Sequence, residues 1–170
     1  MPAIASLSDA DALRLQTTLD GIADESSPSR WAALDQLRYF CDGATMNLLE
    51  AIGGKQFSTV RVLLQLLDTA TEQGGPIAVR SARETQRVPV DMVVELLECL
   101  LCNATANLKP FLKTANGVKN LVGTLSHYEE VMYDAELGPE ILDRACNILC
   151  YCTFYHPSNA ASIFLAADGA

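Results

Sequence analysis

The chain has 170 residues, of which 49% are apolar, and a mean hydropathy of +0.15, so it can bury a sizeable core. Its net charge of −9 argues against a nucleic-acid or anionic membrane surface, because each of those partners requires a clustered positive face. No apolar run reaches the roughly 18 residues of a membrane span, and the acidic N-terminal segment is unlike a signal peptide. We therefore expect a cytoplasmic protein that keeps its six cysteines reduced and attracts basic partners.

Apolar residues recur at helical spacing along nearly the whole chain, and a sustained strand pattern with a period of two residues is absent. Residues 7–23 form the first plausible helix. Two apolar stripes stand out further along: Phe57, Val60, Leu63, Leu64 and Leu67, and then Val118, Leu121, Val122 and Leu125. Pro28, Pro89 and Pro139 each stand at the head of a helical run, where a missing N–H costs least. These patterns predict an all-α fold.

The chain also contains an internal repeat. Aligning "ATANLKPFLKTANGV" with "YHPSNAASIFLAADGA" pairs Asn107 with Asn159 and Gly117 with Gly169 at one constant offset, and residues 30–67 form a looser copy. Each copy is predicted to contain a long helix, a tight polar turn, a short helix ending at a glycine, and a medium helix. The Gly-Gly-Lys at residues 53–55 lacks the rest of a phosphate-binding loop, so we predict a helix C-cap there.

This order of elements resembles the armadillo repeat, whose long helix reads A-L-x-x-L-x-N-h-A; the matching segments begin at Ala33, Leu97 and Ala145. The resemblance implies a right-handed α-solenoid, although HEAT-like and other helical arrays also fit, because the copies are longer than usual for armadillo repeats. It treats residues 1–170 as a single armadillo-like helical domain with these parts: a worn repeat at 7–26, a repeat at 28–71, an insertion at 72–88 before a repeat at 89–128, and a partial repeat at 139–170.

The last copy stops where its short helix would lead into the next unit. Such a stop leaves apolar residues such as Ile163 and Phe164 under-covered, because one solenoid unit cannot bury its face alone. We therefore expect a fragment of a longer array, or self-association through the open C-terminal end.

The cysteines allow three interpretations. Cys146, Cys150 and Cys152 lie close together before His156, and Cys150 aligns with Cys102 of the preceding copy. Cysteines that recur at matching repeat positions favour packing in the core, where small side chains let helices approach closely.

The two alternatives are a zinc site and a thiol nucleophile. A zinc site would combine Cys99, Cys102, Cys150, Cys152 and His156, but the C-x-x-C pair lies within a helix and lacks a knuckle turn. A cysteine nucleophile would need His127 or His156 as its base and an oxyanion donor that the sequence does not indicate. We predict no enzyme activity, no catalytic or metal site, and no cofactor.

The resemblance to armadillo proteins implies a concave groove, lined by the long helices, that binds extended peptides through an Asn and an aromatic residue one turn before it. The corresponding pairs are Asp35 and Tyr39, Cys99 and Asn103, and Asn147 and Tyr151. Only Asn103 keeps the Asn, and none of the pairs has the Trp of the nuclear-import proteins. We expect a protein-interaction scaffold whose groove, with its tyrosines and acidic character, takes a basic peptide or partner protein.

Other functions and another docking surface stay open. The acidic residues between Glu129 and Asp143 form a second candidate surface for a basic partner. The segment "ALDQLRYFCDGATMNLLEAIGG" is similar to the armadillo-like exchange factors of Hsp70 chaperones, so a regulatory domain of that kind, or a small-GTPase regulator, is the first alternative. A zinc- or thiol-dependent enzyme is the second.

Overall fold

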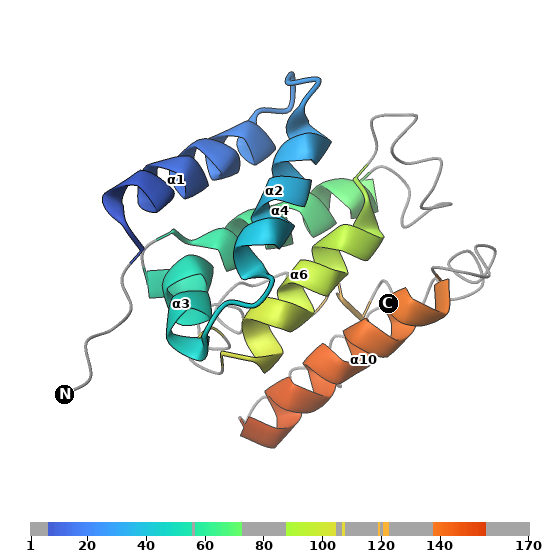
Figure 1. The fold of residues 1–170 in the computed structure, drawn as a ribbon. Coiled ribbons are helices and arrows are strands. Elements are labelled where there is room, and N and C mark those ends of the chain that lie inside the picture. The colour runs from blue at the N-terminus through green and yellow to red at the C-terminus, as the bar shows by residue number, and fades with distance from the viewer. Residues whose placement is uncertain are drawn as a thin grey trace.

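The computed structural model describes residues 7–55, 57–72, 88–104, 107, 119, 121–122 and 138–155, apart from the side chains of residues 55, 71, 72, 152, 153 and 155. In these residues every regular element is helical and no strand occurs, which confirms the all-α prediction. The helices are α1 (Asp9–Ala23), α2 (Arg30–Cys41), α3 (Met46–Glu50), a π-helical turn (Ala51–Lys55), α4 (Thr59–Glu72), α6 (Val90–Cys102) and α10 (Gly138–Tyr155) (Figure 1). None of the described helices has both the length and the apolar character needed to cross a bilayer.

Polar side chains define the ends of the first two helices. Ser8 caps α1: its Oγ accepts the backbone N–H of Asp11 at 3.1 Å and donates to the Asp11 carboxylate at 2.7 Å. In the turn after α1, the hydroxyl and the backbone N–H of Ser26 donate to Asp24, and these bonds lower the pKa of the Asp24 carboxyl. Arg30 then donates from Nε to the Ile22 carbonyl oxygen at 2.6 Å, which ties the start of α2 to the end of α1.

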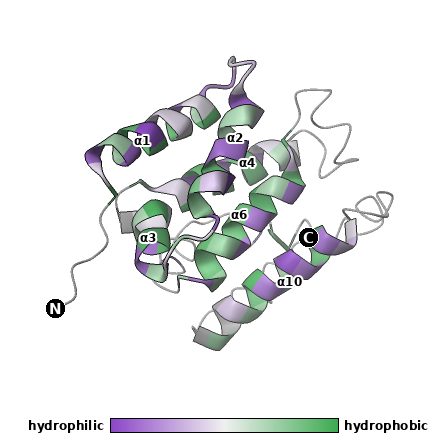
Figure 2. Cartoon of the chain, viewed as in Figure 1, coloured by the Kyte–Doolittle hydropathy of each residue, from purple (hydrophilic) through white to green (hydrophobic). Residues whose placement is uncertain are grey.

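The core is centred on α6, the most apolar of the described helices (Figure 2). It packs against α2, α4 and α10, and eight of its thirteen residues are buried: Val90, Met92, Val93, Val94, Leu96, Leu97, Leu100 and Leu101. The predicted stripe of α4 also lies in the core, where Val60, Leu63, Leu64 and Leu67 are at most 2% exposed. Of the second predicted stripe, Leu121 and Val122 are buried, and its other two members lie outside the described residues.

The helices α2, α6 and α10, which stand at the three positions predicted for the long helix of each repeat, lie side by side and run in the same direction (Figure 1). The helix α1 packs on α2 and α4, and α4 lies behind the row, where it packs on α6 (Figure 1). Each long helix begins within two residues of one of the predicted prolines, Pro28, Pro89 and Pro139. In residues 28–71 a helix, a tight turn, a short helix and a further helix follow one another as predicted, but the predicted lengths are wrong, because α4 has 14 residues and α2 has 12.

A close contact joins the short helix to the end of α6. Asn107 is 1% exposed, and its Nδ2 donates to the carbonyl oxygens of Leu49 at 2.9 Å and Leu100 at 3.0 Å. A β-carbon on Gly53 would overlap this side chain. The π-helical turn ends at Lys55, within the stretch where a helix end is predicted, but Gly53 lies inside the turn and has no positive φ. Asn107 occupies the space that a side chain at residue 53 would need. Gly43, in the tight turn after α2, takes a positive φ of +67°.

Candidate binding groove

The structure brings four of the six predicted groove residues to one place. Asp35 and Tyr39 on α2, Cys99 on α6, and Asn103 just after α6 line a single cavity of about 820 Å³ between the two helices. Asp35, Tyr39 and Asn103 are exposed, and Cys99 is half-buried. Residues from two successive predicted repeats therefore share one accessible site.

Further residues of this cavity were not predicted from the sequence. Its charged lining includes Arg38, Asp42 and Glu95, and its apolar lining includes Met46, Leu49 and Leu96. Arg38 Nε lies 2.9 Å from Glu95 Oε1, so this ion pair joins α2 to α6 along the cavity wall. Arg38 follows Asp35 by three residues, so the sequence could have placed both on one face of α2. No local pattern indicated that Glu95 on α6 would be the partner of Arg38.

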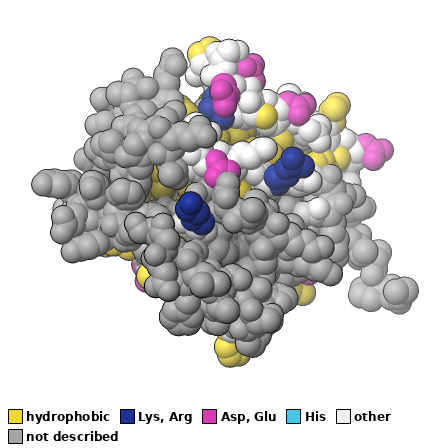
Figure 3. Space-filling model, turned by 180° about the vertical axis from the view of Figure 1, so that it is seen from behind, with side chains coloured by type: hydrophobic (Ala, Val, Ile, Leu, Met, Phe, Trp, Pro, Cys, Tyr) yellow, Lys and Arg dark blue, Asp and Glu magenta, His cyan; other side chains and the backbone are white. Residues whose placement is uncertain are grey.

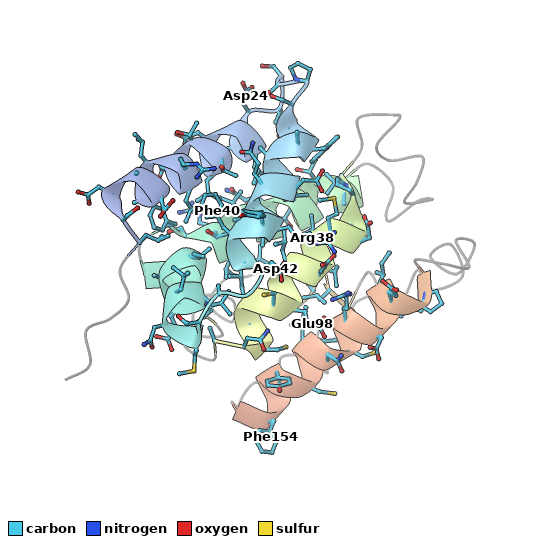
Figure 4. All side chains as sticks on the ribbon, viewed as in Figure 1. Asp24, Arg38, Phe40, Asp42, Glu98 and Phe154 are labelled. Carbon is cyan, nitrogen blue, oxygen red and sulfur yellow. The ribbon has the colours of Figure 1, made fainter. Side chains whose placement is uncertain are left out.

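The cavity carries an excess of negative charge. Asp35, Asp42 and Glu95 contribute carboxylates, and the Arg38 guanidinium is already engaged by Glu95. Asp35 and Asp42 are exposed and form no ion pair within the described part of the chain. Both Arg38 and Asp42 lie on the face of the helix row that is turned to the viewer (Figure 4). On the opposite face, the described acidic and basic side chains are scattered among apolar ones (Figure 3).

Tyr39 forms a ridge between this cavity and a second one. The second cavity, of about 570 Å³, lies between α1 and α2, and Tyr39 lines both. The Tyr39 side chain is 77% exposed, and next to it the Arg14 guanidinium lies 5.8 Å from the centroid of the Phe40 ring. A partner that contacts the Tyr39 ring is thus able to reach into either cavity.

The other two predicted groove residues lie on α10 and do not line the cavity. Asn147 Nδ2 donates to Glu98 Oε1 at 2.9 Å, and Arg144 Nη1 lies 2.8 Å from Glu98 Oε2 (Figure 4). Asn147 thus fastens α10 to α6, while Tyr151, at 37% exposure, stands further along the same helix. The structure places both residues on the helix that continues the row beyond the cavity.

The prediction that the cysteines pack in the core is only partly right. Cys41 is buried, and Cys99 and Cys102 are half-buried, but Cys146 and Cys150 are exposed. The physical reason is the orientation of α10: the face that it turns to the core carries Ile141, Ala145 and Ile148, and Cys146 and Cys150 lie on another face. The side chain of Cys152 lies outside the described residues.

The side chains of Cys41 and Cys99 interact across the contact between α2 and α6. A hydrogen bond between them lowers the pKa of Cys99, against the opposing effect of burial, and raises the pKa of Cys41, which burial raises further. The side chain of Asn103 also lowers the pKa of Cys99, whereas the carboxylates of Glu95 and Glu98 raise it. The first proton therefore leaves this pair more readily than it leaves an ordinary thiol, and the second less readily.

In the described residues, no three His, Cys, Asp or Glu side chains gather as metal ligands would. His127, His156 and the acidic segment from residue 129 to 136 lie outside that part of the chain, so the zinc, nucleophile and acidic-surface hypotheses stay predictions. Comparisons with protein-family models, with curated proteins and with solved structures found no match. The site is therefore interpreted from its own geometry: carboxylates, an exposed phenol ring, an amide and a thiol around an open cavity.

Proposed function

We propose that the chain is a protein-interaction scaffold of the armadillo-like solenoid type, in which α2, α6 and α10 form a groove that binds an extended segment of a partner protein. The cavity between α2 and α6 carries this proposal, because side chains of two predicted repeats meet there and remain accessible. The parallel row of long helices supports it, since peptide-binding solenoids use such rows as extended surfaces.

Tyr39 is the expected anchor of the partner. A tyrosine that is 77% exposed leaves a large amphipathic ring in water, and such rings are enriched among the residues that contribute most to protein interfaces. Its position on the ridge between two cavities allows a bound chain to pack on both faces of the ring. Losing this contact is expected to weaken binding about tenfold or more.

The partner segment is expected to be basic. A Lys or Arg side chain that enters the cavity from the open side would meet the carboxylates of Asp35 and Asp42, which have no ion pair within the described chain. Asn103 donates from Nδ2 to the Cys99 carbonyl oxygen at 3.1 Å, which leaves its Oδ1 to accept a backbone N–H of an extended chain. These two contacts would fix the direction and the depth of the bound segment.

The test is a screen of extended peptide pools that share length and apolar content but carry Lys and Arg, Asp and Glu, or neither. We expect the basic pool to bind, and we expect Tyr39→Ala to weaken that binding about tenfold while the melting temperature stays unchanged. The matched control is Phe154→Ala, because Phe154 is also 77% exposed but lies near the far end of α10 and lines neither of the two cavities that Tyr39 joins (Figure 4). Binding of the acidic pool, or equal losses for the two variants, would remove the groove from the proposal.

A further inference from the structure

The register of α2 against α6 brings two cysteines together. The ion pair between Arg38 and Glu95 fixes which turns of the two parallel helices face each other. Cys41 follows Arg38 by three residues, and Cys99 follows Glu95 by four, so both cysteines fall one turn further along on the same sides of their helices. Both line the cavity between α2 and α6, where their side chains interact across the contact between the two helices.

The two thiols differ in access. Cys41 is 4% exposed and belongs to the core, whereas Cys99 is half-buried and opens towards the cavity. A small oxidant that enters the cavity therefore meets Cys99 first. Cys99 is also the member of the pair whose pKa is lowered, and the thiolate is the reactive form of a cysteine.

We propose that Cys99 and Cys41 form a peroxide-reactive thiol pair, in which hydrogen peroxide oxidises Cys99 and Cys41 then closes a disulfide bond between α2 and α6. In the first step the Cys99 thiolate attacks one peroxide oxygen and the O–O bond breaks. Cys99 becomes a sulfenic acid, and the departing hydroxide takes a proton to form water. In the second step the Cys41 sulfur attacks the Cys99 sulfur, the S–O bond breaks, and the hydroxide leaves with the Cys41 proton as a second water.

The other cysteines whose side chains the structure describes lie outside this cavity. Cys102 lies on α6 one turn beyond Cys99 and is not among the residues that line the cavity. Cys146 and Cys150 are exposed on α10, and burial together with the neighbouring Cys150 raises the pKa of Cys146. These three thiols therefore serve as internal references for the reactivity of the pair.

The experiment treats the reduced chain with hydrogen peroxide, blocks the remaining thiols with N-ethylmaleimide and maps disulfides by mass spectrometry under non-reducing conditions. We expect the peptide that contains Cys41 to be linked to the peptide that contains Cys99, with the loss of two hydrogen atoms. Cys99 and Cys102 share a tryptic peptide, so fragment ions between them, or the Cys102→Ser variant, locate the bond.

Two variants test the order of the steps. Cys41→Ser is expected to stop the reaction at the Cys99 sulfenic acid, which a dimedone probe captures, and Cys99→Ser is expected to abolish both products. Cys102→Ser is the matched control on the same helix, and it should leave the Cys41–Cys99 bond unchanged. Oxidation of Cys146 or Cys150 while Cys99 keeps its thiol would overturn the proposal, as would a disulfide that joins Cys41 to another residue. The mapping of the unmodified chain decides this even if a variant folds poorly.

Discussion

On both sides of α6 a glutamate forms an ion pair with the neighbouring helix, but an open cavity lies on one side and a closely packed contact on the other. Glu95 binds Arg38 of α2 on one side, and Glu98 binds Arg144 and Asn147 of α10 on the other. A cavity of about 820 Å³ remains on the α2 side, whereas Ala145 and Ile148 are fully buried on the α10 side.

The elements that follow α2 account for this difference. The turn at Gly43 and the short helix α3 pass beside the end of α6, and Gly43, Ala44, Met46 and Leu49 form part of the cavity wall. The pair of long helices alone therefore does not make the cavity. The cavity therefore lies on the side of α6 where the turn at Gly43 and the short helix α3 complete its wall.

Among the changes that test this comparison, we expect the largest loss of stability from truncating a core residue of α6. Leu101→Ala should reduce the free energy of unfolding by about 2 to 5 kcal/mol, because Leu101 is fully buried and its truncation leaves a cavity. Leu149→Ala, at the aligned position of α10, should cost about half as much, because Leu149 is only half-buried. Urea unfolding measures both. Equal losses would show that α10 is packed as tightly as α6, and the contrast between the two sides would fail.

The next effect concerns the contact between the short helix and α6. Gly53→Ala should destabilise the fold by about 1 to 3 kcal/mol, because the added methyl group overlaps the Asn107 side chain. The matched control is Gly21→Ala in α1, where the new β-carbon would lie 3.4 Å from the Ala33 β-carbon, an ordinary contact.

Thermal unfolding should show that Gly21→Ala is neutral or stabilises by up to about 1 kcal/mol, since alanine favours a helix over glycine. In the background of Asn107→Ala the overlap is gone, so the cost of Gly53→Ala should fall sharply. A cost that does not change in that background would rule out Asn107 as the obstacle.

A smaller effect separates the two ion pairs of α6. Glu98→Gln should cost about 1 kcal/mol or less, because Glu98 serves two partners and its pair with Arg144 is the less exposed. Glu95→Gln should cost about half of that, since the Arg38 side chain is 56% exposed and solvent screens the pair. Urea unfolding at low and high salt measures both. A larger loss for Glu95→Gln would mean that the α2 side depends more on its ion pair than the α10 side does.

The smallest expected effect concerns the rate at which the cysteines are alkylated, and it leaves the fold unchanged. Alkylation by iodoacetamide requires the thiolate, so its rate rises as pH passes the pKa of each thiol. The pKa of Cys99 is lowered and that of Cys146 is raised, so Cys99 should reach its half-maximal rate at the lower pH. Peptide mass spectrometry of timed samples follows each site. The reverse order of the two midpoints would show that the Cys41 thiol does not stabilise the Cys99 thiolate.

Much of the fold was predictable because its signals are local. The apolar stripe of α4 and the helix starts near Pro28, Pro89 and Pro139 follow from spacing within a few turns. The positions of Asp35 and Tyr39 were recoverable for the same reason, since one turn of helix places them on one face. That they bind a partner stays a prediction.

The features that could not be predicted from the sequence depend on contacts between segments that lie far apart along the chain. The pairing of Arg38 with Glu95 requires the register of two helices, which no local pattern encodes. The exposure of Cys146 and Cys150 depends on which face of α10 meets α6. The requirement for a glycine at residue 53 is set by Asn107, far along the chain, so no local pattern indicates it.

The hydrogen bonds of Asn107 have a consequence for how the chain opens. Its one amide nitrogen serves carbonyl oxygens of two helices, one in each of two successive predicted repeats. If the end of either helix unfolds and displaces Asn107, the carbonyl oxygen in the other helix also loses its donor, the Asn107 Nδ2 group. A buried carbonyl without a partner costs about 1 to 3 kcal/mol. The two segments are therefore coupled into one cooperative unit. In native-state hydrogen exchange, the amides around the ends of α3 and α6 should exchange together, through a shared opening rather than by independent fraying.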